Sequence, residues 1–124
     1  MFGGYNMKYL KMFESSAFYT RVTSNDWAHL VNGTDVLIDM NPYEYDKLES
    51  SLYSICREKK YTYSLSKYYT SNNGIYIRAN ISNKLSMNIY KLEDEWYYVY
   101  LYYIHDFYKC DQLEGLLKFL EDII

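Results

Sequence analysis

The amino-acid sequence predicts a single α+β domain, in which an antiparallel β-meander of four or more strands carries two main helices packed on one face, with the C-terminal helix last. Three observations predict this fold class. Residues 41–58 and 111–123 each place hydrophobic side chains at helical spacing behind capping residues. Residues 61–104 change to a period of two, and short runs of turn residues divide them into four strands.

The bulk composition fits one globular domain over residues 1–124. Hydrophobic residues make up 49% of the chain and charged residues 23%, which is typical of a folded protein. The N-terminus lacks the continuous hydrophobic stretch of a signal peptide, and no segment reaches the ~20 apolar residues of a membrane span. We therefore expect a protein that is neither secreted nor membrane-bound. Residues 1–20 are expected to be either an ordered part of the domain or an arm or edge extension.

Three short elements are predicted before the first long helix. Alternating residues favour short strands at 17–22 and 36–40. Between them, residues 25–31 follow a capping Thr23 or Ser24 and end at an Asn-Gly pair, which predicts a short helix. Its inward side chains are expected to be Trp27, Leu30 and Val31.

The helix at 41–58 has a strong start signal. Asn41 is the predicted N-cap, Pro42 occupies the first turn, and Glu44 completes a capping box. One hydrophobic stripe follows, made of Tyr45, Leu48, Leu52, Ile55 and Cys56. The basic run of Arg57, Lys59 and Lys60 is interpreted as a solvated helix end, where the helix dipole favours cations, with a local basic patch as the alternative.

Each strand of the meander is expected to have one side facing the helices. Those sides are Tyr61, Tyr63 and Leu65; Ile75, Ile77 and Ala79; Leu85, Met87 and Ile89; and Tyr97, Val99, Leu101 and Tyr103. Turns are predicted at 71–74, 82–83 and 93–94. The other side of the fourth strand is an aromatic ladder of Trp96, Tyr98, Tyr100 and Tyr102, which is exposed if helices cover only one face of the sheet.

The final helix is predicted to begin at Asp111, with Glu114 completing a second capping box. Its hydrophobic stripe is Leu113, Leu116, Leu117, Leu120 and Ile124. Gly115 inside this helix costs about 1 kcal/mol relative to Ala, so we expect it to permit close approach to the sheet.

Few residues are candidates for chemistry. His105, Asp106 and Cys110 are the residue types of a Cys–His nucleophile, but no glycine-rich elbow or further orienting group accompanies them. They are interpreted as a strand-end residue, a turn residue and a buried thiol. Three carboxylates in "LEDE" at 92–95 can do acid–base work or hold Mg²⁺, and at a hairpin tip they are expected to be solvated.

No catalytic residue, cofactor or metal site is predicted. The chain contains neither zinc-ligand spacing nor the common nucleotide and hydrolase motifs. Its two cysteines, Cys56 and Cys110, are interpreted as free buried thiols, with one bridge between the helices as the alternative.

The leading functional hypothesis is a non-enzymatic interaction or structural protein that associates with itself or a protein partner through an aromatic sheet face or an edge strand. The predicted surface is Trp96, Tyr98, Tyr100 and Tyr102, with Tyr76 and Tyr90 beside them. Serine at positions 98 and 100 is expected to weaken association without unfolding the chain. Single-stranded nucleic-acid binding by stacking is the alternative. The net charge of −3 disfavours it, as does a polar face expected to offer only Lys67, Arg78, Lys84 and Lys91 against Glu93, Asp94 and Glu95. An atypical small enzyme is a further alternative.

The segments "IYKLEDEW" at 89–96 and "FYKCDQLEGLLKFL" at 107–120 carry a resemblance. Their order, an "LEDEW" hairpin, an aromatic strand and "YKCDQ" leading into "GLL", resembles small uncharacterised proteins of giant viruses, the nucleocytoplasmic large DNA viruses of protists. The resemblance covers the C-terminal third and implies no activity. It implies a location in host cytoplasm, viral factory or virion.

Overall fold

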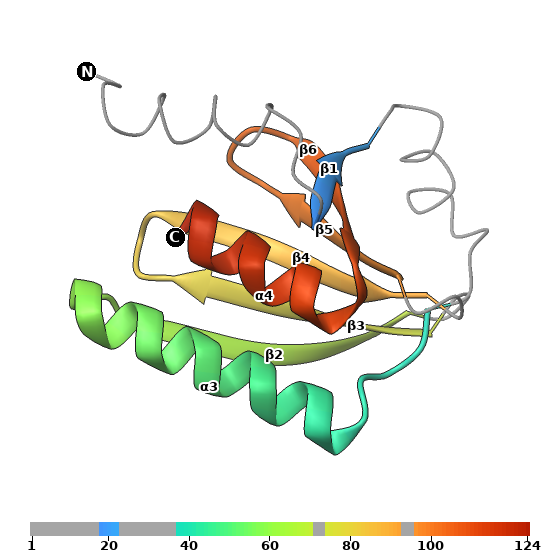
Figure 1. The fold of residues 1–124 in the computed structure, drawn as a ribbon, viewed down its shortest axis with the longest axis horizontal. Coiled ribbons are helices and arrows are strands. Elements are labelled where there is room, and N and C mark those ends of the chain that lie inside the picture. The colour runs from blue at the N-terminus through green and yellow to red at the C-terminus, as the bar shows by residue number, and fades with distance from the viewer. Residues whose placement is uncertain (1–17, 23–36, 71–73, 93–95) are drawn as a thin grey trace.

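The computed structural model describes residues 18–22, 37–70, 74–92 and 96–124. The elements, in chain order, are β1 (Tyr19–Arg21), α3 (Pro42–Lys59), β2 (Tyr63–Thr70), β3 (Gly74–Ile81), β4 (Leu85–Lys91), β5 (Trp96–Leu101), β6 (Asp106–Asp111) and α4 (Gln112–Ile123). Figure 1 shows both helices lying on the near side of the sheet.

The strands form one antiparallel sheet in the order β1-β6-β5-β4-β3-β2. Strands β2 to β6 are therefore a meander, and β1 adds to its far edge by pairing Tyr19 with Cys110. The predicted α+β class is confirmed, and the described sheet has six strands.

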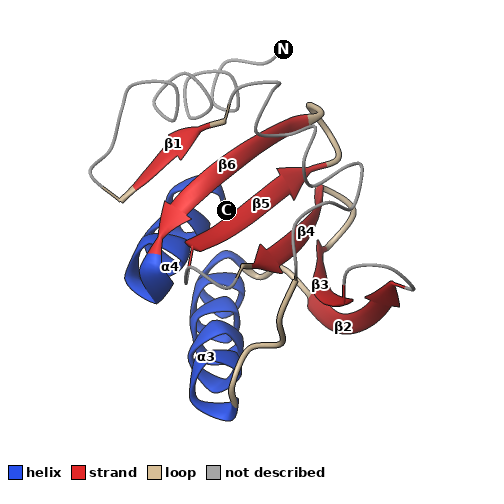
Figure 2. Cartoon of the chain, turned by 90° about the vertical axis from the view of Figure 1, so that its right-hand side faces the viewer, coloured by secondary structure: helices blue, strands red, loops and turns tan. Residues whose placement is uncertain are grey.

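Both helices pack on the same face of the sheet (Figure 2). The core between them contains Ile77 and Ala79 of β3 and Met87 and Ile89 of β4, which were predicted to face inward, together with Leu48, Leu52 and Cys56 of α3. Burying each leucine contributes about 2 kcal/mol relative to leaving it exposed. Phe119 of α4, absent from the predicted stripe, is also fully buried.

The N-terminus of α3 is the capping box that the sequence predicts. The Glu44 amide donates to the Asn41 side chain at 2.8 Å, and the Asn41 amide donates to the Glu44 carboxylate at 2.9 Å. At the other end Lys60 adopts a left-handed conformation, and Lys59 donates to the Ile124 carbonyl at 2.9 Å. The basic run therefore lies at the helix end, as interpreted from the sequence.

The start of α4 differs from the prediction. Asp111 is the N-cap residue, but its side chain makes no capping hydrogen bond. Its amide, the donor that Glu114 would use in a capping box, donates to the Phe18 carbonyl at 2.9 Å, because Asp111 is still part of β6. The chain turns from strand to helix at Gln112, whose φ is +57°.

Gly115 does permit close approach, as expected. A Cβ at this position would lie 2.4 Å from the Phe18 carbonyl oxygen, well inside any real contact. The helix interior therefore requires glycine where α4 crosses the chain beside β1.

The fourth predicted strand is shorter than the pattern suggested. β5 ends at Leu101, and Tyr103 lies in the following turn with 60% of its surface exposed, so its predicted inward position is wrong. Asp106, predicted as a turn residue, is the first residue of β6. That strand was missed because both of its faces are covered, so Phe107 and Tyr108 are adjacent hydrophobic residues without alternation.

Several predicted elements lie outside the described residues: the helix at 25–31, the hairpin residues 71–73 and the carboxylates at 93–95. Of the two short predicted strands, 17–22 contains β1. The second, 36–40, is represented by Leu37, which forms an isolated antiparallel bridge with Leu92. No helix in the described parts of the chain is long and apolar enough to cross a membrane.

Candidate interaction surface

The sheet face opposite the two helices carries mainly aromatic side chains. We call it the aromatic face and define it by these described residues: Tyr68, Tyr76, Arg78, Asn88, Tyr90, Trp96, Tyr98, Tyr100, Tyr102 and Phe107. All six residues of the predicted interaction surface lie on it.

The part of this face over β5 and β6 is largely covered. Tyr98 is 7% exposed and Phe107 4% exposed, and they pack with Leu37 and Leu92. The expectation of an exposed ladder is therefore wrong at Tyr98. Trp96, Tyr100 and Tyr102 are half-buried.

Over β2, β3 and β4 the face is more open. Tyr68 is exposed, and Tyr76 lies between it and Tyr90, with ring centroids 5.6 Å and 5.3 Å away. Tyr102 reaches this region from the turn after β5. We call Tyr68, Tyr76, Tyr90, Tyr102 and the Arg78 between them the aromatic patch.

Arg78 holds the patch together. Its guanidinium lies 4.9 Å from the ring centroids of both Tyr68 and Tyr102. It also donates to the Asn88 side-chain oxygen at 3.0 Å and to the Tyr102 hydroxyl. The guanidinium face thus stacks on aromatic rings while its edge makes hydrogen bonds, a combination that lysine cannot supply.

Asn88 is the buried polar centre beneath this patch, with 4% of its surface exposed. Its amide donates to the hydroxyls of Tyr90 at 2.9 Å and Tyr102 at 3.0 Å. Because a buried amide is costly unless it is paired, these bonds fix the positions of both rings.

Burial raises the pKa of two tyrosine hydroxyls on this face. It raises the pKa of Tyr90 to about 12, and neighbouring Tyr102 and Tyr76 act in the same direction. Burial likewise raises the pKa of Tyr100, whose hydroxyl lies 2.8 Å from Nδ1 of His105. Burial therefore favours the neutral form of both hydroxyls.

The Cys–His candidate is not assembled. His105 contacts Tyr100 on the aromatic face, whereas Cys110 is fully buried in the core on the helix side. Asp106 pairs with Arg21 at 2.8 Å. Burial raises the pKa of the Cys110 thiol, which is the opposite of what an activated nucleophile requires.

Both cysteines are free and buried, as interpreted from the sequence. Within the described ranges, no group of three or more His, Cys, Asp or Glu side chains is placed to hold a metal ion.

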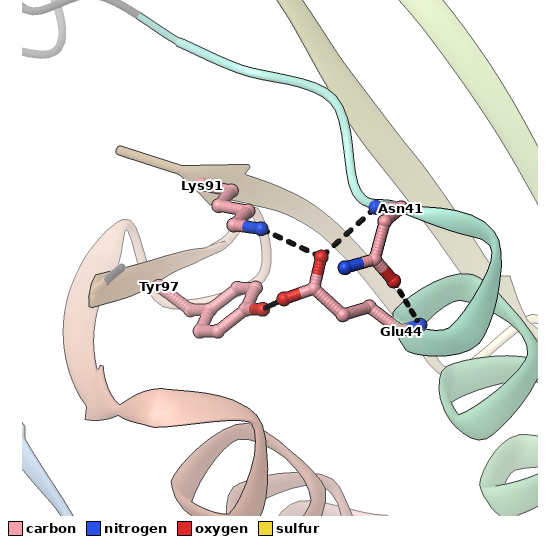
Figure 3. A network of polar contacts seen from close by, with 4 residues as sticks. All are labelled: Asn41, Glu44, Lys91 and Tyr97. Atoms are coloured by element: carbon pink, nitrogen blue, oxygen red, sulfur yellow. Dashed lines mark hydrogen bonds and ion pairs between the residues drawn. The ribbon is translucent and has the colours of Figure 1, made fainter. Parts of the chain in front are cut away.

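A second polar cluster joins α3 to the sheet (Figure 3). Lys91 of β4 donates to Glu44 Oε1 at 2.6 Å, and the Tyr97 hydroxyl donates to Glu44 Oε2. Burial alone would raise the pKa of Glu44, but these two donors and the Asn41 amide outweigh it, so the pKa lies below its ordinary value. The cluster satisfies a buried ion pair and fixes the start of the helix.

Sequence reasoning placed two lysines on the wrong side of the sheet. Lys91 was assigned to the polar face but points to the helices, as does Lys67, which pairs with Asp39 at 3.1 Å and lies over the Tyr45 ring. Continuing the alternation of β4 past Ile89 would have placed Lys91 correctly.

Two residues of the patch, Tyr68 and Arg78, and the Asn88 beneath it were missed as surface candidates. Alternation places each on the aromatic face, but only the strand register brings them together. Arg78 is opposite Asn88 across the β3–β4 pair, and Tyr68 is opposite Tyr76 across the β2–β3 pair.

Comparisons with known proteins give no match: no family model, no curated protein and no solved structure matches this chain. The surface is therefore interpreted from its own geometry.

Proposed function

We propose that this protein is a non-enzymatic interaction protein that associates with further copies of itself, using the aromatic patch as a contact surface. The patch joins two properties of protein interfaces. It offers aromatic rings and an arginine, the side chains that contribute most at binding hot spots. Its rings are also held in place before binding, which lowers the entropic cost of association.

The observation that carries this proposal is the Arg78–Asn88 network beneath half-buried tyrosines. Asn88 donates hydrogen bonds to the hydroxyls of Tyr90 and Tyr102, and Arg78 donates to Asn88 and to Tyr102. These bonds fix both rings. Such a network presents flat aromatic surface to solvent on a sheet face that no described helix covers. Aromatic surface held in this way is typical of a contact region rather than of a hydrophobic core.

The test is the mass of the purified protein in solution, measured by light scattering over a range of concentrations. The wild type is expected to form dimers or larger species. Tyr76→Thr removes the central ring while keeping a good strand former, so it is expected to reduce the mass at a given concentration.

Tyr53→Ala is the matched control, because it removes a 52% exposed ring from α3 on the opposite side of the molecule. It is expected to leave the mass unchanged. A wild type that stays monomeric at every concentration, or a Tyr76→Thr variant that assembles as the wild type does, contradicts the proposal.

Single-stranded nucleic-acid binding remains the second candidate, and one observation favours it. Lys109 lies 4.1 Å from the Trp96 ring centroid, so the aromatic face has a second cation beside its rings. Bases stack on such platforms, and their phosphates pair with such cations. Oligonucleotide binding that weakens steeply with added salt would support this candidate, whereas self-association through aromatic contacts depends little on salt.

A further inference from the structure

The two edges of the sheet are very different. The β1 edge strand has three residues, whereas the β2 edge strand has eight and contains no proline. Figure 2 shows β2 at the margin of the sheet away from β1. Proteins usually shorten or obstruct exposed edge strands, because the unpaired main-chain groups recruit other strands.

The register identifies which main-chain groups of β2 face outward. The Ser82 amide donates to the Thr62 carbonyl at 2.8 Å, which makes Thr62–Ser82 a hydrogen-bonded pair. Such pairs alternate in an antiparallel ladder, so the even-numbered residues of β2 bond to β3. The odd-numbered residues direct their N–H and C=O groups away from the sheet: Tyr63, Leu65, Lys67 and Tyr69. Among the described residues none of these groups has a strand partner.

We propose that a second copy of this chain pairs with β2 in antiparallel orientation, joining two sheets into one across a two-fold axis at Ser66. This inference rests on the proposed self-association and gives it a second contact, made by main-chain groups rather than by the patch. A two-fold axis perpendicular to the sheet keeps both pairs of helices on the same side, so residues of equal parity face each other.

Hydrogen bonding and side-chain compatibility together favour this register, since only an axis at Ser66 pairs all four outward-facing residues within β2. With the axis at Ser66, Leu65 is opposite Lys67 of the other copy, and Tyr63 is opposite its Tyr69. The outward-facing groups of all four odd-numbered residues then form hydrogen bonds. An axis one residue later places two Lys67 side chains directly opposite each other, which like-charge repulsion disfavours. Lys67 remains paired with Asp39 of its own chain in the Ser66 register.

The pairing predicts a specific cross-link. Ser66 would face its own symmetry mate in a pair without mutual hydrogen bonds, where Cα atoms are about 4.5 Å apart. That separation suits a disulfide. Ser66→Cys is therefore expected to form a disulfide-linked dimer under mild oxidation, seen by non-reducing electrophoresis. The native thiols are buried and do not compete.

Ser64→Cys is the matched control, because Ser64 is equally exposed on the same side of β2. In the proposed register its symmetry mate is four residues away along the strand, about 13 Å, which is too far to bridge. Equal cross-linking at both positions would indicate random collision and overturn the register.

A second pair of variants tests the main chain itself. Tyr69→Pro removes an outward N–H, while Tyr69→Thr removes the same 81% exposed ring and keeps that N–H. We expect Tyr69→Pro to raise the dimer dissociation constant at least about tenfold relative to Tyr69→Thr, since symmetry removes two hydrogen bonds. Equal dissociation constants would overturn the edge contact.

The outcomes separate the two proposals. A Ser66→Cys cross-link that survives in a Tyr76→Thr background, with Tyr76→Thr itself assembling normally, supports the edge contact and rejects the aromatic patch. If the cross-link is absent while Tyr76→Thr still lowers the mass, the edge contact is rejected and the patch remains. A monomeric wild type with no cross-link rejects both.

Discussion

At the scale of single residues, one carboxylate links the start of α3 to two strands. Glu44 accepts hydrogen bonds from Lys91, Tyr97 and the Asn41 amide, and its side chain is only 13% exposed. An ion pair this buried stabilises only while both partners are present, because removing one leaves the other charged and poorly solvated.

Glu44→Gln is expected to lower the free energy of unfolding by about 2 kcal/mol, since the amide cannot satisfy the buried Lys91 charge. Urea denaturation at neutral pH measures the loss. Glu49→Gln, at an exposed position on the same helix, should change stability little. Equal effects from both substitutions would show that the cluster contributes nothing specific.

The same carboxylate is expected to make the free energy of unfolding depend on pH in the acidic range. The pKa of Glu44 is lower in the folded protein than its ordinary value of 4.5, so the folded state binds this proton less readily than the unfolded state. The stabilisation is therefore complete above that ordinary value and is lost as the pH falls through the folded-state pKa. The stability difference between wild type and Glu44→Gln should shrink over that acidic range. A constant difference would contradict the linkage.

Tyr98 and Tyr76 share the aromatic face but differ in role. Tyr98→Ser removes a buried ring and is expected to cost about 3 kcal/mol of unfolding free energy. Tyr76→Thr should cost clearly less, because its ring is half-buried. Serine at 98 and 100 is thus no clean test of association, and thermal denaturation of the two single variants would show the difference.

At the scale of elements, the sequence predicts best where one signal is unambiguous. The capping box at Asn41 and the helical stripe behind it locate α3 to within one residue at each end. β6 could not be found in this way. Residues on both of its faces are buried, so its sequence does not alternate between hydrophobic and polar residues. At Asp111 the capping pattern matched, but the Asp111 side chain makes no capping bond. Its amide, which Glu114 would have to use to complete the box, donates to the Phe18 carbonyl.

On the aromatic face, too, the sequence pattern predicted only part of the structure. Alternation within β5 assigned Tyr98 and Tyr100 to that face. Whether each ring is covered depends on the chain crossing at Leu37, which no local pattern encodes. The central position of Arg78 likewise depends on register across three strands.

Gly115→Ala tests the contact between α4 and the chain before β1. Helix propensity alone favours Ala by about 1 kcal/mol. The new methyl group would meet main-chain atoms of Phe18, which cannot move as a flexible side chain can. We expect a net loss of about 1–2 kcal/mol in urea denaturation. A gain in stability would show that α4 does not pack closely against the chain before β1. Ser50→Ala, at an exposed site in α3, is the control expected to be neutral or slightly stabilising.

At the scale of the whole molecule, association and folding should be linked. If copies bind only when folded, mass action raises the denaturation temperature with protein concentration. Wild-type protein is expected to show this dependence in calorimetry, and a Tyr69→Pro, Tyr76→Thr double variant is expected to lose it. A denaturation temperature that does not vary with wild-type concentration would contradict self-association.

The pairing of β1 with β6 has a consequence for the order in which the chain is completed. The Tyr19 hydroxyl donates to Asp122, 103 positions away, at 2.6 Å, and its ring packs edge-on against Phe119. β2 to β6 can pair as successive local hairpins, but β1 has no partner until nearly the whole chain has left the ribosome. During synthesis, β1 therefore lacks its strand partner while β2 to β5 are being made. A nascent chain halted before residue 106 should lack native protection at Tyr19, whatever the state of its hairpins.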